Sequence, residues 1–153
     1  MSIDLDRAQM LMSELGSRMP EEVTVSQVEE SLWTIQFEDN SALLVQWANT
    51  PERLVLSATL GRAQAEQQLA LYEILLSYNL LWQETGGVRI GMDGAQGELT
   101  MIYDFFADSL STSTLLTVVL NLANLARVWR AYVSGNDSPP EFGIDPGAVA
   151  SFA

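Results

Sequence analysis

Residues 33 to 60 alternate between apolar and polar side chains, and this period of two residues constrains the fold more than any other feature of the sequence. The apolar positions are Trp33, Ile35, Phe37, Leu43, Val45, Trp47, Leu54, Leu56, Ala58 and Leu60. Turn-forming residues at 39–41 and 49–52 divide the run into three segments. Alternation places one set of side chains on one face of a strand. The sequence therefore predicts a three-stranded antiparallel meander with one strongly apolar face, to whose opposite face Leu32, Leu44 and Val55 add apolar area.

Helical periodicity precedes this meander. Leu5, Ala8, Met12, Leu15 and Met19 recur at spacings of three and four residues, which places them on one helix face. The pattern predicts a helix from residue 4 to residue 18, which Gly16 and Pro20 bring to an end. Met10 and Leu11 widen the apolar stripe beyond what one core-facing side requires.

The segment from Ala63 to Trp82 also has helix-forming composition, and its second half is apolar nearly all round. Its apolar side chains are Leu69, Leu71, Tyr72, Ile74, Leu75, Leu76, Tyr78, Leu80, Leu81 and Trp82. Such a helix needs cover on nearly all sides, and a small domain has few elements to supply it. We therefore expect a second subunit on this helix. Trp82, at its end, is the tryptophan best placed for an interface, whereas Trp33, Trp47 and Trp129 occupy predicted core positions.

A second hairpin and a long helix complete the predicted order. Residues 88–92 and 99–105 alternate around the loop 93–97, and residues 109–133 carry a helical apolar stripe with Ser111 and Ser113 as candidate N-caps. The order is α-βββ-α-ββ-α, an α+β fold with a twisted antiparallel sheet packed against helices. We assign residues 1–133 to one domain and expect the Gly/Pro-rich tail 134–153 to be mobile.

Composition excludes many kinds of chemistry. The 153 residues contain no Lys, His or Cys, and 20 acidic residues against 7 arginines give a net charge of −13. Zinc fingers, thiol nucleophiles, Ser-His-Asp triads, Schiff bases and P-loop lysines are therefore ruled out. Strong negative charge disfavours nucleic acid and anionic membrane surfaces. We expect no cofactor and no metal.

The apolar segments are also too short for a bilayer. The first residues show neither the basic nor the apolar region of a secretory signal, and the stretch from Leu69 to Trp82 is interrupted by polar residues. We therefore expect a cytoplasmic protein without membrane insertion.

Paired carboxylates are the remaining catalytic material. The pairs are Asp4/Asp6, Glu21/Glu22, Glu29/Glu30 and Glu38/Asp39. Such pairs serve as acid and base in hydrolases, yet each lies beside a predicted turn or helix end, where acids are ordinarily solvated. A carboxylate-dependent hydrolase is the least favoured reading. No basic residue lies between Arg18 and Arg53, and the acids there have two open interpretations, solubility or the steering of a basic polypeptide.

Three segments together resemble a known family. The first is Asn79-Leu80-Leu81-Trp82-Gln83-Glu84-Thr85-Gly86-Gly87, in which a leucine-rich helix runs into a Gly-Gly turn. The second is the strand Val88-Arg89-Ile90-Gly91-Met92-Asp93, and the third is Ala126-Arg127-Val128-Trp129-Arg130 in the last helix. With the acidic, cysteine-free composition, this order resembles the class I chaperones of bacterial type III secretion, the Tir-chaperone or CesT-like family.

The resemblance implies a homodimer that works without ATP and is not an enzyme. Such a chaperone binds the N-terminal segment of one or more secreted effector proteins and keeps it non-globular and ready for export. The second helix and the strand after the Gly-Gly turn form the dimer interface, here Leu69, Tyr72, Leu76, Leu80, Trp82, Val88, Ile90 and Met92. Candidate effector contacts are Met10, Leu11, Leu32, Leu44 and Val55, beside a sheet edge that accepts an effector strand. The alternative is a regulatory module of the same fold that binds an anti-activator or another secretion regulator.

Overall fold

The computed structural model describes residues 4–106 and 111–135. The chain divides into two compact units, unit 1 from Met1–Ala58 and Asp104–Asn124, and unit 2 from Thr59–Tyr103 and Leu125–Ala153. Sequence positions 109–110 and 136–153, which the predictions for the last helix and the tail include, lie outside the described residues.

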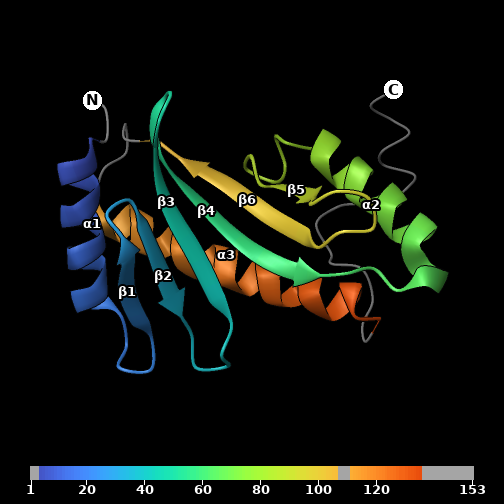
Figure 1. Cartoon of the computed structure of the whole chain (residues 1–153), viewed down its shortest axis with the longest axis horizontal. Helices are drawn as coiled ribbons and strands as arrows, with labels where there is room; N and C mark the ends of the chain where they lie inside the picture. Colours follow the sequence, from blue (N-terminus) through green and yellow to red (C-terminus); the bar gives the residue numbers. More distant parts are fainter. Residues whose placement is uncertain (1–3, 107–110, 136–153) are drawn as a thin grey trace. The chain divides into compact units, whose positions relative to one another are not determined.

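Three α-helices, a 3-10 turn and six strands make up the described chain (Figure 1). They are α1 (Leu5–Arg18), β1 (Thr24–Glu29), β2 (Leu32–Gln36), β3 (Ala42–Asn49), β4 (Glu52–Gly61), η1 (Ala65–Gln67), α2 (Gln68–Leu80), β5 (Arg89–Met92), β6 (Leu99–Phe105) and α3 (Thr112–Val133). The strands form one sheet in the order β1-β2-β3-β4-β6-β5. The predicted α+β class is confirmed.

Helix α1 begins and ends as the periodicity predicts. The Asp4 carboxylate accepts a hydrogen bond from the backbone N–H of Arg7 at 2.7 Å and so caps the helix. Ala8, Leu11, Met12 and Leu15 are buried in unit 1. Leu11 is only 2% exposed, so the expectation that it is surplus apolar surface is wrong. Spacings of three and four residues place it on the same buried stripe as Ala8 and Leu15.

The predicted meander is formed by β2, β3 and the first part of β4. Trp33 pairs with Val45, and Val45 pairs with Leu56, so a row of buried side chains crosses all three strands. Trp47 is half-buried rather than fully inside, because it lies near the end of β3. The first half of α3 contributes Leu115, Val119 and Leu122 to the core of unit 1.

Strand β1 is absent from the sequence prediction. Only Val25 among its residues is partly buried, and the rest are exposed. A strand that buries neither face produces no alternation of apolar and polar residues, so the pattern that revealed the meander is missing here. Strand β1 is defined instead by its antiparallel pairing with β2. The pairing runs from Thr24 opposite Gln36 to Glu29 opposite Leu32, and its register shifts between Gln27 and Glu29.

The core of unit 2 is built from α2, β5, most of β6 and the second half of α3. Tyr78 meets Trp129 edge-on, with ring centroids 5.0 Å apart and the rings inclined by 78°. Ile90 and Met101 are paired across β5 and β6, and both are buried. Gly86 and Gly87, with φ of +68° and +90°, form the predicted turn before β5.

Helix α3 has one of its predicted caps. Ser111 Oγ accepts a hydrogen bond from the backbone N–H of Thr114 at 3.1 Å, as expected for a residue just before the helix. Two hydrogen bonds join this first turn of α3 to helix α1: Thr112 Oγ1 donates to the Glu14 carboxylate, and the Arg18 guanidinium donates to Ser113 Oγ at 3.0 Å.

Candidate protein-binding surfaces

The outer face of the meander in unit 1 carries no charged side chain over its central rows. One row runs from Leu32 through Gln46 to Val55, and the next runs from Thr34 through Leu44 to Ser57. Leu44 is exposed, Leu32 and Val55 are half-buried, and together with their polar neighbours they form what we call the open sheet face. In a chain with net charge −13, an uncharged surface of this kind can receive apolar and hydrogen-bonding groups without desolvating a carboxylate.

The two edges of the sheet differ. Strand β1 ends the strand order, and within residues 4–106 and 111–135 no strand pairs with its outer side. An unpaired edge presents a row of backbone donors and acceptors to any extended chain. Figure 1 shows α1 beside this edge, and Met10 of α1 is exposed. The candidate contacts Met10, Leu32, Leu44 and Val55 are thus present at the surface of unit 1, whereas Leu11 is inside.

The opposite edge, β5, is occupied by the chain itself. Asn79 of α2 brackets Ile90: its Nδ2 donates to the Ile90 carbonyl at 2.8 Å, and its Oδ1 accepts from the Ile90 N–H at 2.9 Å. The Val88 N–H donates to the Thr85 carbonyl at 3.3 Å, and Thr85 Oγ1 donates to the Val88 carbonyl at 3.2 Å. These bonds satisfy the backbone groups that an added strand would need, so β1 is the edge better suited to strand addition.

Helix α2 exposes an apolar face. Leu69 and Leu76 are 75% and 72% exposed, and Leu80 and Trp82 are also largely exposed. Positions 69, 76 and 80 lie on one side of the helix by their spacing, with Tyr72 half-buried on the same side. A contiguous exposed apolar patch of this kind ordinarily marks an interaction site.

A groove of about 300 Å³ continues this face within unit 2. Its lining residues are Tyr72, Leu75, Leu76, Asn79, Ile90, Gly91, Met92 and Leu99. The groove thus brings side chains of α2 and β5 together, and their role in a dimer interface stays a prediction. Val88 and Ile90 are themselves buried in the single chain, so of the three predicted contacts in this segment only Met92 is exposed.

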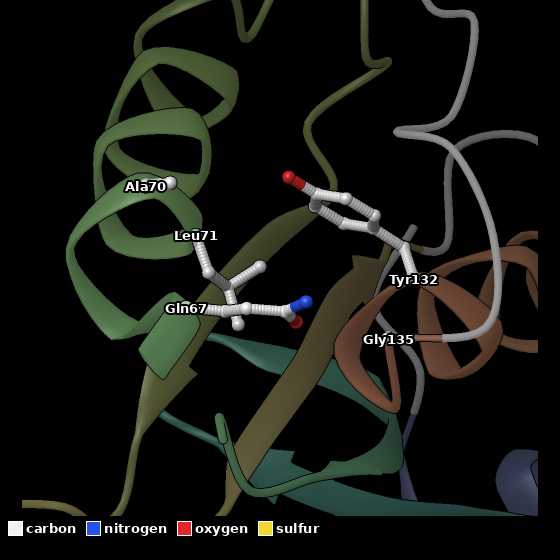
Figure 2. A pocket seen from close by; sticks show the side chains of 5 residues that line it. All are labelled: Gln67, Ala70, Leu71, Tyr132 and Gly135. Carbon is white, nitrogen blue, oxygen red and sulfur yellow. The ribbon is translucent and has the colours of Figure 1, made fainter. Parts of the chain in front are cut away.

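A smaller cavity of about 180 Å³ lies elsewhere in unit 2 (Figure 2). It is lined by Gln67 at the end of η1, Ala70 and Leu71 of α2, Tyr132 of α3, and Gly135 just after α3. Figure 2 shows the Tyr132 ring and the Gln67 amide projecting toward the same space. Burial raises the pKa of the Tyr132 hydroxyl above its ordinary value of 10.0. No pattern in the sequence distinguishes this site, because its residues come from two helices far apart in the chain.

Several acidic side chains of the described part of the chain stand at a helix cap, at turns and at strand ends. Within it, no group of three or more acidic side chains is arranged to hold a metal ion. Asp4 caps α1, and Glu29 and Glu38 stand at exposed strand ends or turns. None of the described helices has the length and apolarity needed to cross a membrane.

An α+β fold with an open sheet face, an unpaired edge and an apolar helix face defines a small protein-binding domain. The chain belongs to the Tir chaperone protein (CesT) family, whose family model matches residues 14–130. A solved structure with a similar fold is the "Crystal Structure of the ExsC-ExsE Complex", which is 20% identical with a TM-score of 0.69. The similarity covers 87% of this chain and 97% of that one. A sequence search of curated proteins found no match.

Proposed function

We propose that this chain is a type III secretion chaperone that binds the N-terminal segment of one or more secreted effector proteins in the bacterial cytoplasm and keeps it non-globular, soluble and export-competent. The observation that carries the proposal is the open sheet face beside the unpaired edge of β1. Family membership supports the role. The chaperone acts by binding alone, without ATP, cofactor or catalysis.

An extended effector segment adds to β1 as a further strand. Main-chain hydrogen bonds along an edge are largely indifferent to the sequence of the added strand, so the same edge serves several clients. Alternate side chains of the segment then point toward the open sheet face or toward α1. Leu32, Leu44 and Val55 lie one, two and three strands further into the sheet than β1, so in this proposal they receive apolar groups from a part of the segment that continues across the open sheet face. Met10, which is flexible and polarizable, receives side chains of the added strand itself.

The functional form in this proposal is a homodimer built on α2. The exposed side chains Leu69, Leu76 and Leu80 with Trp82 would bury their apolar surface against a second copy, and the groove beside Tyr72 and Met92 would extend that interface. Two copies carry a net charge of −26, twice −13, which keeps the loaded complex soluble.

The test is co-purification of the full chain with its partner from cells in which secretion is induced, followed by light scattering to obtain the stoichiometry. We expect two copies of this chain with one copy of a larger protein, lost when the N-terminal segment of that protein is deleted. A variant with Leu44→Glu places a charge on the open sheet face, and we expect at least a tenfold loss of recovered partner.

A matched control exists on the same unit. Leu120 of α3 is 41% exposed, against 43% for Leu44, but it lies outside the sheet, so Leu120→Glu should leave partner recovery unchanged. If Leu44→Glu binds as well as the native chain, or if both variants lose the partner equally, the open sheet face is not the binding site.

A regulatory module of the same fold is the second candidate. The similar solved structure is a complex of two named proteins, ExsC and ExsE, which supports partner binding by this fold without fixing the class of partner. The same co-purification separates the two: a secretion regulator as the sole partner, with no effector, would favour the regulatory role.

A further inference from the structure

Strand β1 contains one residue that its pairing with β2 leaves over. Gln27 lies opposite Trp33 and Glu29 lies opposite Leu32. The two partners on β2 are consecutive, so Val28 is the extra residue of a β-bulge. Bulges on edge strands ordinarily re-aim a side chain or end a run of pairing.

The side chain in this bulge is apolar and exposed. Val28 is 57% exposed, more than Leu44 of the open sheet face at 43%. Gln27 Nε2 donates to the Glu30 carbonyl at 3.2 Å, a hydrogen bond that joins the two sides of the bulge. Single exposed apolar residues are common on proteins. Val28 differs by its position, because it lies on the edge with which no strand of the described residues pairs, where an added strand would be its immediate neighbour.

The fold alone does not account for a valine at this position. Sheet edges are protected from uncontrolled pairing by bulges and by charged side chains. The bulge, with the exposed carboxylates of Glu29 and Glu30 directly after it, already provides both devices. An exposed apolar side chain at the same place has the opposite effect, because it favours contact with another chain.

We propose that an extended client segment pairs with Thr24–Gln27 of β1 and places an apolar residue, with a lysine or arginine beside it, against Val28. This inference rests on the proposed function and names the client sequence that the edge prefers. Apolar side chains opposite one another on neighbouring strands stabilise a sheet by direct contact, so Val28 favours an apolar partner. The exposed carboxylates of Glu29 and Glu30 favour a basic residue next to it.

The bulge gives this contact its weight in client choice. Pairing on β1 is regular only from Thr24 to Gln27, before the register shifts. Main-chain hydrogen bonds along so short a run carry little sequence preference, whereas side-chain contacts do. The contact at Val28 therefore discriminates between segments that the edge would otherwise accept alike.

Peptide selection on the full chain tests this preference without a natural client. The probe is a phage-displayed library of random peptides of about 12 residues, longer than a typical strand. Val28→Thr keeps the β-branched shape and replaces a methyl group by a hydroxyl group. Its matched control is Val128→Thr, at a position of α3 that is 43% exposed. A double variant with Glu29→Gln and Glu30→Gln removes two charges, and Glu66→Gln with Glu73→Gln removes the same charge from exposed positions of unit 2.

From the native chain and both controls we expect peptides in which an apolar residue lies within two positions of a lysine or arginine, enriched on the order of threefold or more over the unselected library. Selection on Val28→Thr should lose the apolar preference. Selection on the variant of Glu29 and Glu30 should lose the basic preference and keep the apolar one. The absence of this pattern from the native chain, or the same pattern from Val28→Thr, would overturn the proposal.

Backbone amide exchange then locates the bound peptide. With the most enriched peptide added as a synthetic probe, we expect amides within Thr24–Gln27 to exchange about tenfold more slowly or less, and those of Arg89–Met92 to be unchanged. Slower exchange in Arg89–Met92, or none in Thr24–Gln27, would contradict the proposed site. Because the selection uses no natural client, its failure leaves the co-purification result intact, and a failed co-purification leaves the selection result intact.

Discussion

At the scale of single residues, Tyr78 makes stability depend on alkaline pH. Its hydroxyl is in the core of unit 2, with 1% of the residue exposed, and burial raises its pKa to about 12 from 10.0. The folded chain keeps this proton between pH 10 and 12 while the unfolded chain loses it. The free energy of unfolding therefore falls with rising pH across this window, by on the order of 2 kcal/mol. Urea unfolding at a series of pH values measures the decline.

The chain is well suited to that measurement because it has no Lys and no Cys, whose side chains would titrate in the same range. A variant with Tyr78→Phe cannot ionise at this position and should lose most of the decline, leaving the smaller contribution of Tyr132, whose pKa is also raised by burial. An equally steep decline in Tyr78→Phe would show that another group controls alkaline stability.

At the scale of elements, a substitution on the exposed face of α2 tests whether a residue there serves a dimer interface or the fold of the single chain. Leu76 is largely exposed in the single chain, so Leu76→Asp should change the fold of the monomer little, by about 0.5 kcal/mol. In the proposed homodimer the same change buries an unpaired charge. We expect light scattering to show the mass of one chain for Leu76→Asp while circular dichroism keeps its native shape. Val128→Asp, at an exposed position of α3 in the same unit, should keep the mass of the native protein. Retention of the native mass by Leu76→Asp would place the interface elsewhere.

Elements that bury one face could be predicted from the sequence, and those that do not were missed. In helix α1 apolar residues recur every three or four positions, and in strands β2 to β4 apolar and polar residues alternate, because one side of each element meets a core. These periods, with the residues that end each element, predict where the helix and the strands lie. Strand β1 is exposed on both faces and left no period to detect. Leu11 was misplaced because helical spacing gives the width of an apolar stripe but not how many neighbouring elements cover it. The cavity at Gln67 and Tyr132 depends on two helices meeting, which local patterns do not record.

At the scale of the whole molecule, charge surrounds rather than covers the open sheet face. Glu29 and Glu30 stand at the turn between β1 and β2, and Glu38 and Asp39 at the turn between β2 and β3, all exposed, while the central rows of the face are uncharged. This arrangement distinguishes the two interpretations of the acidic residues. Carboxylates that only maintain solubility leave the rate of partner association insensitive to salt. Carboxylates that steer a basic client segment raise that rate at low ionic strength.

Stopped-flow association of the full chain with its co-purified partner decides between them. Raising the ionic strength from about 0.01 M to about 1 M shortens the screening length from about 30 Å to about 3 Å. We expect the association rate constant to fall on the order of tenfold or more over this range, with a smaller change in the dissociation rate constant. A double variant with Glu29→Gln and Glu30→Gln should already associate more slowly at low salt, whereas Glu66→Gln with Glu73→Gln, which removes the same charge from unit 2, should not. At the highest salt concentration the field of these carboxylates is screened within about 3 Å, so any steering of the partner must be lost there. An association rate constant that does not change with salt would therefore mean that the acidic residues serve solubility alone.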